Sequence, residues 1–424
     1  MHPLTKLLYN DMKPALGVTE PGAIAFAVAK ARSYTKGSIQ SVRLTLNSGM
    51  YKNAFTCGIP HSDSVGNTFA AALGVVAGNC DKELMALEDI TPDDNKEAQR
   101  LIDEGKIIVH LGEITPVIFI EATVTTAHDT CTVTIQHKHT NITRIVKNDH
   151  IIHESPMPTV AGNHKTSPIH NYSIADCMKY ATTVPLEVLH FIQQAFTTNL
   201  ALFNEGMESP RTTFAKQLKK LNGGEIISKD AIATSQLLCN ATIEARVIGL
   251  NKPAMSITGS GAHGIIATMP LYAVAQVEAY GDETLLRATA LSFLITIYIK
   301  EYSGALSALC GCAVAAGTGM ACGLAFMRGA TLTQVVHTIQ NMASSITGMI
   351  CDGGNQGCTM KGVTGVDAAF RAVQFAMHGI FVDDVHGING ATPEETLKNI
   401  GQIASPGMVQ TEKTIVDIFQ AKGR

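Results

Sequence analysis

The chain contains no tryptophan, and both aromatic and charged residues are scarce. Aromatic side chains make up 5% and charged side chains 16% of the 424 residues, and the formal net charge is −4 at pH 7. A nucleic-acid-binding protein needs a concentrated basic surface, which this composition does not supply. We therefore expect no nucleic-acid partner, and a small neutral or zwitterionic ligand suits the charge balance better.

We expect no secretory signal, and the chain has no long run of large apolar side chains. Residues 1–10 include a single lysine and no apolar core. The strongest candidate for a membrane span, Ser303 to Met327, consists mainly of small residues, which favours a buried helix. We expect a cytoplasmic protein with no membrane partner, whose ten cysteines stay reduced and serve as buried side chains or metal ligands.

Apolar residues make up 46% of the chain, enough to bury a large core in one large or two ordinary domains. The first part of the chain is rich in β-branched residues and alternates with period two, as strands do. Two helices are expected within it, at about 14–33 and 67–78. The predicted strands, whose later members are joined by turns short enough for an antiparallel sheet, cover residues 38–46, 51–57, 106–111, 116–126, 131–139 and 143–146.

The character of the chain changes at His153 to His170, a segment rich in proline, histidine and serine, where we place a domain boundary. Beyond it nearly every segment has the pattern of a helix of ordinary length, and Asp230 and Thr392 are expected to cap two of these helices. The sequence thus predicts an α+β fold. Residues 1–165 form an α+β domain with an antiparallel sheet, and residues 170–424 form an α-helical domain.

Cys351 and Cys358 flank a glycine-rich turn, and Cys310 and Cys312 lie shortly upstream on a segment of small residues. An iron-sulfur cluster that keeps one iron open is usually bound by three cysteine thiolates of the protein, whereas a closed structural zinc site needs four ligands. On a helix Cys310 and Cys312 would point about 200° apart, so we do not expect both to bind one cluster. The structural alternative is that these cysteines are inert buried thiols.

Residues Gly259 to Gly264 fit the dinucleotide fingerprint, but a helix precedes them and no alternation of strand and helix follows. We favour a glycine loop that opens a helix, in which backbone amides of Gly259, Ser260 and Gly261 hold a substrate carboxylate at the positive end of the helix dipole. A tight turn between two helices is the alternative.

His61 lies in a polar loop between a predicted strand and a predicted helix, and it is a candidate substrate-binding residue because such loops commonly contact substrates. His137 and His139 alternate along a predicted strand. A two-histidine metal site is one interpretation, and solvated side chains are the preferred one.

Four motifs occur in order between about residue 10 and residue 420. They are Leu16-Gly17-Val18-Thr19-Glu20-Pro21, Ser307-Ala308-Leu309-Cys310-Gly311, Ile350-Cys351-Asp352-Gly353 through Cys358, and Glu395-Thr396 with Asn399 and Gly401 followed by Gly407-Met408. Together they resemble the L-cysteine desulfidase group, which belongs to the iron-sulfur L-serine dehydratase alpha-like superfamily.

The resemblance implies a 4Fe-4S cluster held by Cys310, Cys351 and Cys358, with the fourth iron free to act as a Lewis acid on the substrate. Residues 170–424 would then be an iron-sulfur catalytic domain, and no pyridoxal phosphate would be needed. The expected reaction is α,β-elimination from a small L-amino acid, either L-cysteine to sulfide, ammonia and pyruvate or a relative such as L-serine.

The chain departs from the family pattern Gly-Cys-Thr-Glu-Pro at Val18, which replaces the cysteine proposed as proton acceptor. Glu20 or His263 is then the candidate base, and a changed substrate or an altered or inactive homologue that senses a metabolite is the alternative. We expect the helix from about Pro14 to bring Thr19, a candidate substrate contact, and Glu20 to the cluster in the groove between the domains. The sequence leaves open whether the chain forms a homo-oligomer.

Overall fold

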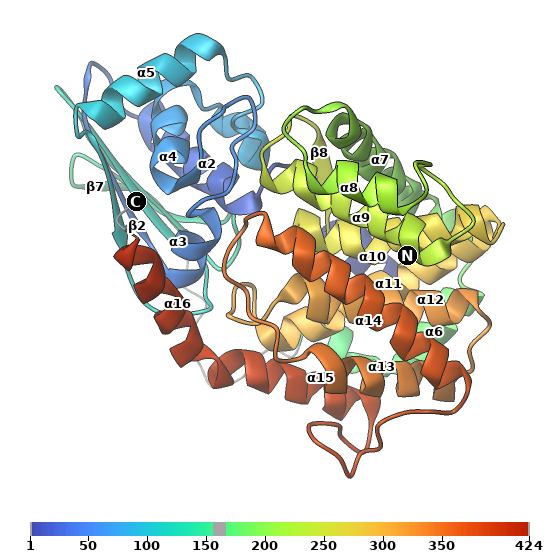
Figure 1. Cartoon of the computed structure of the whole chain (residues 1–424). Coiled ribbons are helices and arrows are strands. Elements are labelled where there is room, and N and C mark those ends of the chain that lie inside the picture. The colour runs from blue at the N-terminus through green and yellow to red at the C-terminus, as the bar shows by residue number, and fades with distance from the viewer. Residues whose placement is uncertain (1, 156–166, 423–424) are drawn as a thin grey trace.

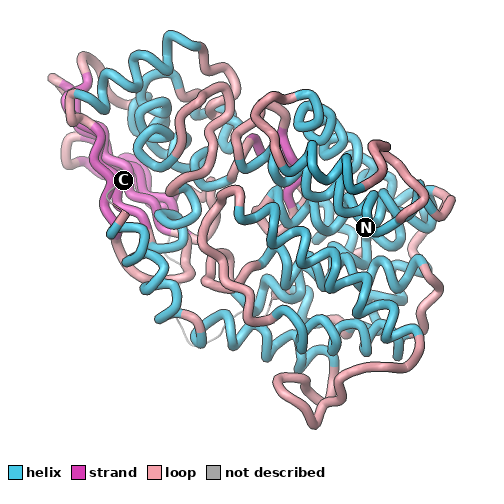
Figure 2. Tube along the Cα trace, in the orientation of Figure 1, coloured by secondary structure: helices cyan, strands magenta, loops and turns pink. Residues whose placement is uncertain are grey.

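The computed structural model describes residues 2–155 and 167–422 and has an α+β fold (Figure 1). Six strands gather in a sheet at one end of the molecule, a separate pair of short strands lies in the other part, and helices make up most of the remainder (Figure 2). The segment predicted as the domain boundary, 153–170, lies largely outside the described residues, so the position of that boundary stays a prediction.

The main sheet has six strands in the order β3-β2-β4-β5-β6-β7. β2 and β3 pair in parallel, while the other neighbours pair antiparallel, as we predicted for the sheet as a whole. The parallel pair is possible because a long helical connection lies between its strands. The strands are β2 (Ile39–Leu46), β3 (Ile107–Leu111), β4 (Phe119–Thr126), β5 (Thr130–Gln136), β6 (Ile142–Lys147) and β7 (His150–Glu154).

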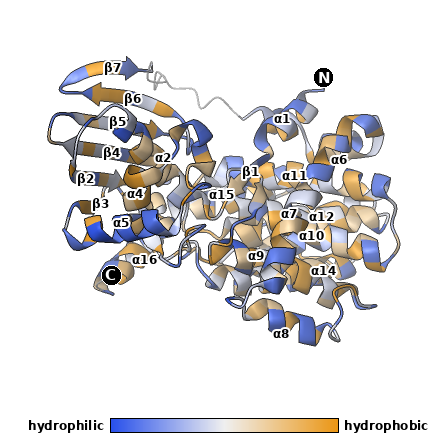
Figure 3. Cartoon of the chain, turned by 90° about the horizontal axis from the view of Figure 1, so that it is seen from above, coloured by the Kyte–Doolittle hydropathy of each residue, from blue (hydrophilic) through white to orange (hydrophobic). Residues whose placement is uncertain are grey.

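Helices α2 (Thr19–Ser33) and α4 (Gly66–Ala77) pack against the sheet, and α5 (Pro92–Asp103) packs on α4 (Figure 3). Alternate residues of β4 are buried on the helix side, which is the period-two pattern that predicted this strand. α2 and α4 approach so closely at Gly74 that a Cβ atom there would lie 2.8 Å from the backbone of Ala25. The small residues of these helices therefore serve close packing.

Two predictions for the first part of the chain are wrong. Residues 51–57, predicted as a strand, fall mostly in helix α3 (Ser48–Ala54). The helix predicted from about Pro14 begins at Thr19, because residues 13–16 form strand β1 (Lys13–Leu16). β1 pairs antiparallel with β8 (Pro253–Ser256) of the helical part, so this local change depends on a partner more than 200 residues away.

The helical part surrounds a central group of almost fully buried helices, α9 to α12. Asp230 caps α9 and Thr392 caps α15, as predicted. Among the described residues, no helix is both long enough and apolar enough to cross a membrane. The helices are α6 (Ile174–Thr183), α7 (Gln193–Glu208), α8 (Phe214–Leu221), α9 (Ala231–Val247), α10 (Gly261–Val277), α11 (Asp282–Ser303), α12 (Gly317–Met327), α13 (Leu332–Ile346), α14 (Gly357–Met377), α15 (Pro393–Gln402) and α16 (Val409–Ala421).

Short turns of tighter or wider helix connect these elements. They are the 3₁₀ segments η1 (Cys80–Met85), η2 (Pro168–Asn171) and η3 (Leu186–Ile192) and the π-helical segments η4 (Cys312–Ala316) and η5 (Ile403–Gly407). η4 opens α12 at the predicted cysteine site, and π-helical turns are frequent at functional sites.

Both ends of the chain cross between the two parts of the molecule. Helix α1 (Pro3–Asp11) packs against α11, and Thr5 and Tyr180 are joined by a 2.7 Å hydrogen bond. Helix α16 leaves the helical part and packs on α3, where Phe419 stacks on Phe55 with ring centroids 4.8 Å apart (Figure 1). The sheet and the helical part therefore share one continuous core.

Candidate active site at the cysteine segments

Two segments far apart in the sequence bring the cysteines together. Leu309 pairs with Ile350 in an isolated antiparallel bridge. The amide of Cys310 donates to the carbonyl of Met349 at 2.9 Å, and the amide of Cys351 donates to the carbonyl of Ala308 at 2.6 Å. This short backbone pairing, formed by residues about 40 positions apart, is what places Cys310 beside Cys351.

The second cysteine segment turns back at Gly353, whose φ is +98°, and Cys358 stands in the first turn of α14. A side chain at Gly353 would meet the carbonyl oxygen of Lys52 at 2.5 Å. Glycine is needed here for both its positive φ and its lack of a Cβ, because the turn lies against α3. The thiol of Cys358 donates to the Gly353 carbonyl at 3.4 Å.

Cys310 and Cys312 do not point apart as the helical geometry predicted. Cys310 precedes the helical turn that begins at Gly311. The two thiols are therefore not rotated apart by about 100° per residue, as they would be within a helix. The thiols hydrogen-bond to each other, and this contact lowers the pKa of Cys310 to about 7. Cys312 is therefore a fourth thiol at the site and stays an alternative ligand.

A small cavity of about 70 Å³ lies where the two cysteine segments meet α2, α10 and α11. It has room for a small ligand only, well below the roughly 300–1,000 Å³ of drug-sized sites. Of the candidate residues discussed from the sequence, those that line it are Val18, Glu20, His139, Gly259, Ser260, His263, Cys312, Cys351 and Cys358.

Four other candidate residues lie outside the cavity lining. Cys310 is 3% exposed and contacts Cys312, and Thr19 is buried beside Arg246. Gly261 begins α10 next to the cavity. His61 instead lines a separate surface groove beside α4 and α5, where its amide donates to Asn251 at 2.8 Å. The structure therefore does not bring His61 to the cysteines.

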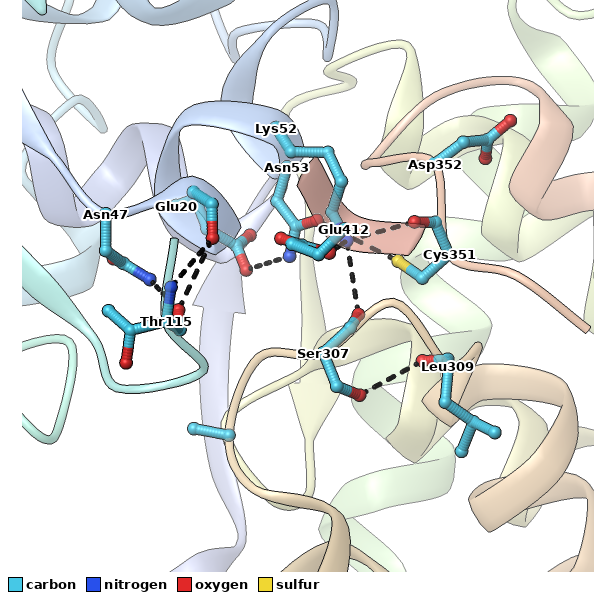
Figure 4. A network of polar contacts seen from close by, with 12 residues as sticks. Glu20, Asn47, Lys52, Asn53, Thr115, Ser307, Leu309, Cys351, Asp352 and Glu412 are labelled. Atoms are coloured by element: carbon cyan, nitrogen blue, oxygen red, sulfur yellow. Dashed lines mark hydrogen bonds and ion pairs between the residues drawn. The ribbon is translucent and has the colours of Figure 1, made fainter. Parts of the chain in front are cut away.

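Glu20 reaches Cys351 through a single intervening side chain. Asn53 donates to Glu20 Oε1 at 2.9 Å, and its own Oδ1 lies 3.8 Å from Cys351 Sγ (Figure 4). Burial tends to raise the pKa of Glu20, but contacts with His139, Asn53 and Arg246 outweigh it and lower the pKa to about 2. Glu20 is thus a stable carboxylate, and a carboxylate with such a low pKa is a weak base.

His263 lies on the first turn of α10 and is held by a defined partner. Its Nδ1 lies 2.6 Å from Thr258 Oγ1, and that hydroxyl donates to the Ile257 carbonyl at 2.7 Å. Because the hydroxyl has only one proton, it accepts from Nδ1–H, and Nε2 is left with its lone pair. Burial and the charges of Lys300 and Arg246 lower the pKa of His263, so the ring is neutral.

The basic nitrogen of His263 faces the cysteine segment. A side chain at Gly311 would meet His263 Nε2 at 2.6 Å, so only glycine fits between the ring and the two neighbouring cysteines. Thr258, which holds the other side of the ring, has a φ of 53°, unusual for a β-branched residue. Its amide donates to the Asp11 carboxylate at 2.6 Å.

Sequence reasoning missed several charged residues around the cavity. Lys52 is 1% exposed, and its ammonium donates to Glu412 at 2.7 Å, to the Cys351 carbonyl at 2.9 Å and to the Ser307 carbonyl at 3.1 Å (Figure 4). Arg246 and Lys300 line the cavity from α9 and α11. The available signal was a charged residue inside an otherwise apolar helical segment, which is rare unless the charge has a partner or a function.

His139 was also misjudged. It follows the end of β5 and is not on a strand, and its side chain is only 11% exposed. Its Nε2 lies 3.8 Å from Glu20 Oε1 and has no hydrogen-bond partner among the described residues. The solvated interpretation is therefore wrong for His139, which belongs to the wall of the cavity, whereas His137 is exposed as expected.

Val18, which stands where the resembled family has the cysteine proposed as proton acceptor, lies at the cavity. It is 3% exposed, precedes α2 in an extended conformation and lines the cavity. A side chain at Gly354 would meet Val18 Cγ1 at 2.8 Å, so position 18 packs directly on the turn between Cys351 and Cys358. The absence of a titratable group at this position therefore bears on the chemistry of the cavity.

The thiols fit an iron-sulfur cluster better than a single metal ion. Within residues 2–155 and 167–422, no three His, Cys, Asp or Glu side chains are placed to bind one ion. A single zinc needs every sulfur within about 2.3 Å of one point, whereas cluster ligands each bind a different iron and stand further apart. Thiolates are the ligands that iron-sulfur clusters take, and the charges of Cys310, Cys351 and Cys358 all act on Cys312.

The comparisons with known proteins agree with this arrangement. Residues 81–417 match the family of the serine dehydratase alpha chain, so the chain belongs to that family. It is also 38% identical to a UPF0597 protein of Clostridium botulinum over 425 residues, with 98% of each chain covered. UPF0597 proteins of Caldanaerobacter subterraneus and Clostridium tetani are 34% and 33% identical, and both alignments cover at least 97% of each chain.

Proposed function

We propose that this protein is an iron-sulfur lyase that carries out α,β-elimination on a small L-amino acid, L-cysteine or a relative such as L-serine. One observation carries the proposal: three thiols, with a fourth in contact with one of them, line one small cavity that is also lined by a neutral histidine, two buried cations and a carboxylate. Membership of the serine dehydratase alpha chain family supports the same reaction class. A reducing compartment such as the cytoplasm would keep the thiols available.

Cys310, Cys351 and Cys358 would hold a 4Fe-4S cluster, with Cys312 as the alternative ligand. When bound, the cluster would supply a Lewis acid for the leaving sulfur or oxygen on the β-carbon. The cavity is small enough to exclude most water, which keeps charged groups in it strongly interacting.

His263 is the base that we propose in place of the family's cysteine. Its Nε2 accepts the proton from the α-carbon while the bond from the β-carbon to sulfur or oxygen breaks, and a double bond forms between the α- and β-carbons. The resulting aminoacrylate tautomerises and is hydrolysed by water to pyruvate and ammonia. Thr258 keeps the proton on Nδ1, so that Nε2 alone is basic.

The second candidate function is an altered homologue that binds the cluster and senses a metabolite without turnover. The observation that favours it is Val18, which leaves the family's basic position without a titratable group at the cavity. The two functions differ in one measurement. Cluster-loaded protein that breaks down no member of a panel of small amino and hydroxy acids would support the sensor.

We expect Cys358→Ser to abolish cluster assembly, because serine offers a poor ligand at one of three required positions. The measurements are iron and sulfide content and the visible spectrum of protein prepared without oxygen. Cys322→Ser is the matched control, since Cys322 is fully buried in α12 and does not line the cavity. Full iron content in the Cys358→Ser protein would contradict the ligand assignment.

Val18→Cys is expected to raise the rate of L-cysteine breakdown in cluster-loaded protein. A second base at this position is worth at most the two to four orders of magnitude of general base catalysis, or about 10²- to 10⁴-fold. Val28→Cys is the control, because Val28 is buried in α2, the helix that Val18 precedes, and does not line the cavity. An unchanged rate in a protein that already acts rapidly would show that position 18 is not the base and would support His263.

A further inference from the structure

Arg246 is a buried cation whose hydrogen-bonding capacity is largely unused. It lies near the end of α9, is 4% exposed and lines the cavity. Among the described residues its one hydrogen bond is a long contact of 3.5 Å from Nη2 to Thr19 Oγ1, and its Nε has no partner. A guanidinium has five N–H donors, and burying a charge with so few partners is costly. The position calls for an anionic ligand.

A second set of donors lies beside the guanidinium. Ser260 precedes α10 without a side-chain cap, and no hydrogen bond from the amides of Gly261 or Ala262 to another described residue is found. A side chain at Gly261 would meet Arg246 Nε at 2.6 Å, so the helix end and the guanidinium are adjacent. Free amides at the positive end of a helix attract the same kind of ligand as the arginine does.

We propose that Arg246, together with the first amides of α10, binds the α-carboxylate of the substrate. Arginine presents two parallel donors in a plane, which matches the two oxygens of a carboxylate. The volume of the cavity, about 70 Å³, restricts the ligand to a small carboxylate. This inference rests on the proposed function for the identity of the reaction, but the binding of a carboxylate can be measured without it.

Glu20 then has a complementary part in binding. It lines the same cavity, and the arginine is close enough to lower the pKa of its carboxyl group. A ligand whose carboxylate meets Arg246 and whose ammonium meets Glu20 is an α-amino acid in its zwitterionic form. The site would select such a molecule over a simple amine or a simple carboxylic acid.

The test uses unreactive ligands and the cluster-loaded protein under anaerobic conditions. L-alanine has the carboxylate and the ammonium but no leaving group, ethylamine lacks the carboxylate, and propionate lacks the ammonium. Calorimetric titration should show that L-alanine binds more tightly than either. In Arg246→Met the affinity for L-alanine should fall on the order of 10- to 100-fold, the usual effect of losing a charged hydrogen bond, while that for ethylamine stays unchanged.

Three further variants control for damage to the fold. Arg246→Lys keeps the positive charge but lacks the two parallel N–H donors of the guanidinium, so its affinity for L-alanine should lie between those of the wild type and Arg246→Met. Gly261→Ala displaces the guanidinium and should weaken L-alanine binding even if Arg246→Met does not fold. Arg144→Met removes a half-exposed arginine of β6 and should bind L-alanine as the wild type does.

Turnover separates a failure of this inference from a failure of the proposed function. For a reactive substrate, Arg246→Met should raise KM more than it lowers kcat, because the carboxylate contact is made before and during the reaction. Wild-type affinity for L-alanine in both Arg246→Met and Gly261→Ala would overturn the inference. Tight, Arg246-dependent binding of L-alanine without turnover of any amino acid would uphold it and refute the lyase.

Discussion

Lys52→Met is expected to lower the free energy of unfolding by about 3–5 kcal/mol, because it leaves the partner charge of a buried ion pair uncompensated. The side chains of Lys52 and Glu412 are 1% and 7% exposed and 2.7 Å apart. Burial tends to lower the pKa of Lys52, but the charges of Cys351 and Glu412 outweigh it and raise the pKa, so the ammonium stays charged. Chemical denaturation followed by circular dichroism measures the loss.

The loss should also be visible locally. Lys52 joins α3, α16 and both segments that carry the cysteines, so its removal should increase amide hydrogen exchange in α16 and around Cys351 (Figure 4). The control is Lys413→Met, which removes a half-exposed ion pair of the same helix and should change stability by no more than about 1 kcal/mol. Equal effects of the two substitutions would refute a special role for Lys52.

Replacing Glu412 as well as Lys52 tests the physical reason. The double variant Lys52→Met with Glu412→Leu removes both charges, and replacing a buried ion pair with apolar side chains is often neutral or stabilising. It should therefore be more stable than Lys52→Met alone, although the carbonyls of Ser307 and Cys351 still lose their donor. A double variant that is less stable than the single one would show that uncompensated charge is not the cause.

His263→Gln is expected to lower kcat by about 10²- to 10⁴-fold, the usual contribution of a general base. Glutamine keeps a polar side chain of similar reach but cannot accept the α-proton. Iron content should stay at the wild-type level, which separates loss of the base from loss of the cluster. His337→Gln is the matched control, because burial also lowers the pKa of His337 but the residue does not line the cavity.

The pH dependence supplies an independent check. A base with the ordinary histidine pKa of about 6.5 would make the rate fall on the acid side of the pH–rate profile near that pH. Because the pKa of His263 is lowered, we expect this fall at a lower pH. The unfolded chain takes up this proton near pH 6.5 and the folded chain only below it, so His263 also makes the fold less stable as the pH falls below about 6.5. A rate that falls to half of its maximum at about pH 6.5 through this group would contradict the assignment.

The sequence predicted the sheet well because its strands follow local rules. β4 alternates between buried and less buried positions with a period of two, β5 does so over its first half, and a short turn joins them, so their pairing needed no distant information. The helix caps at Asp230 and Thr392 are also local, since the capping side chain bonds to amides within the next turn. The parallel pairing of β3 with β2 was missed because it depends on a long crossover.

At the candidate site the sequence identified the residue types but not their geometry. The motifs singled out the cysteines, Glu20 and His263, all of which lie at or next to one cavity. Local helical geometry predicted that Cys310 and Cys312 point apart, whereas their thiols meet. The reason is the bridge between Leu309 and Ile350, which keeps Cys310 outside the helix and could not be read from either segment alone.

Local pattern by itself determined the α+β class, most strands, the helix caps and the glycine turn that brings Cys351 and Cys358 together. Only the tertiary structure decided where the buried charges go. A lysine or arginine inside an apolar segment is stable only where the rest of the chain or a ligand supplies an acceptor, and such partners lie far away in sequence. Lys52 pairs with Glu412 at the other end of the chain, whereas Arg246 lines the cavity and its Nε has no hydrogen-bond partner among the described residues.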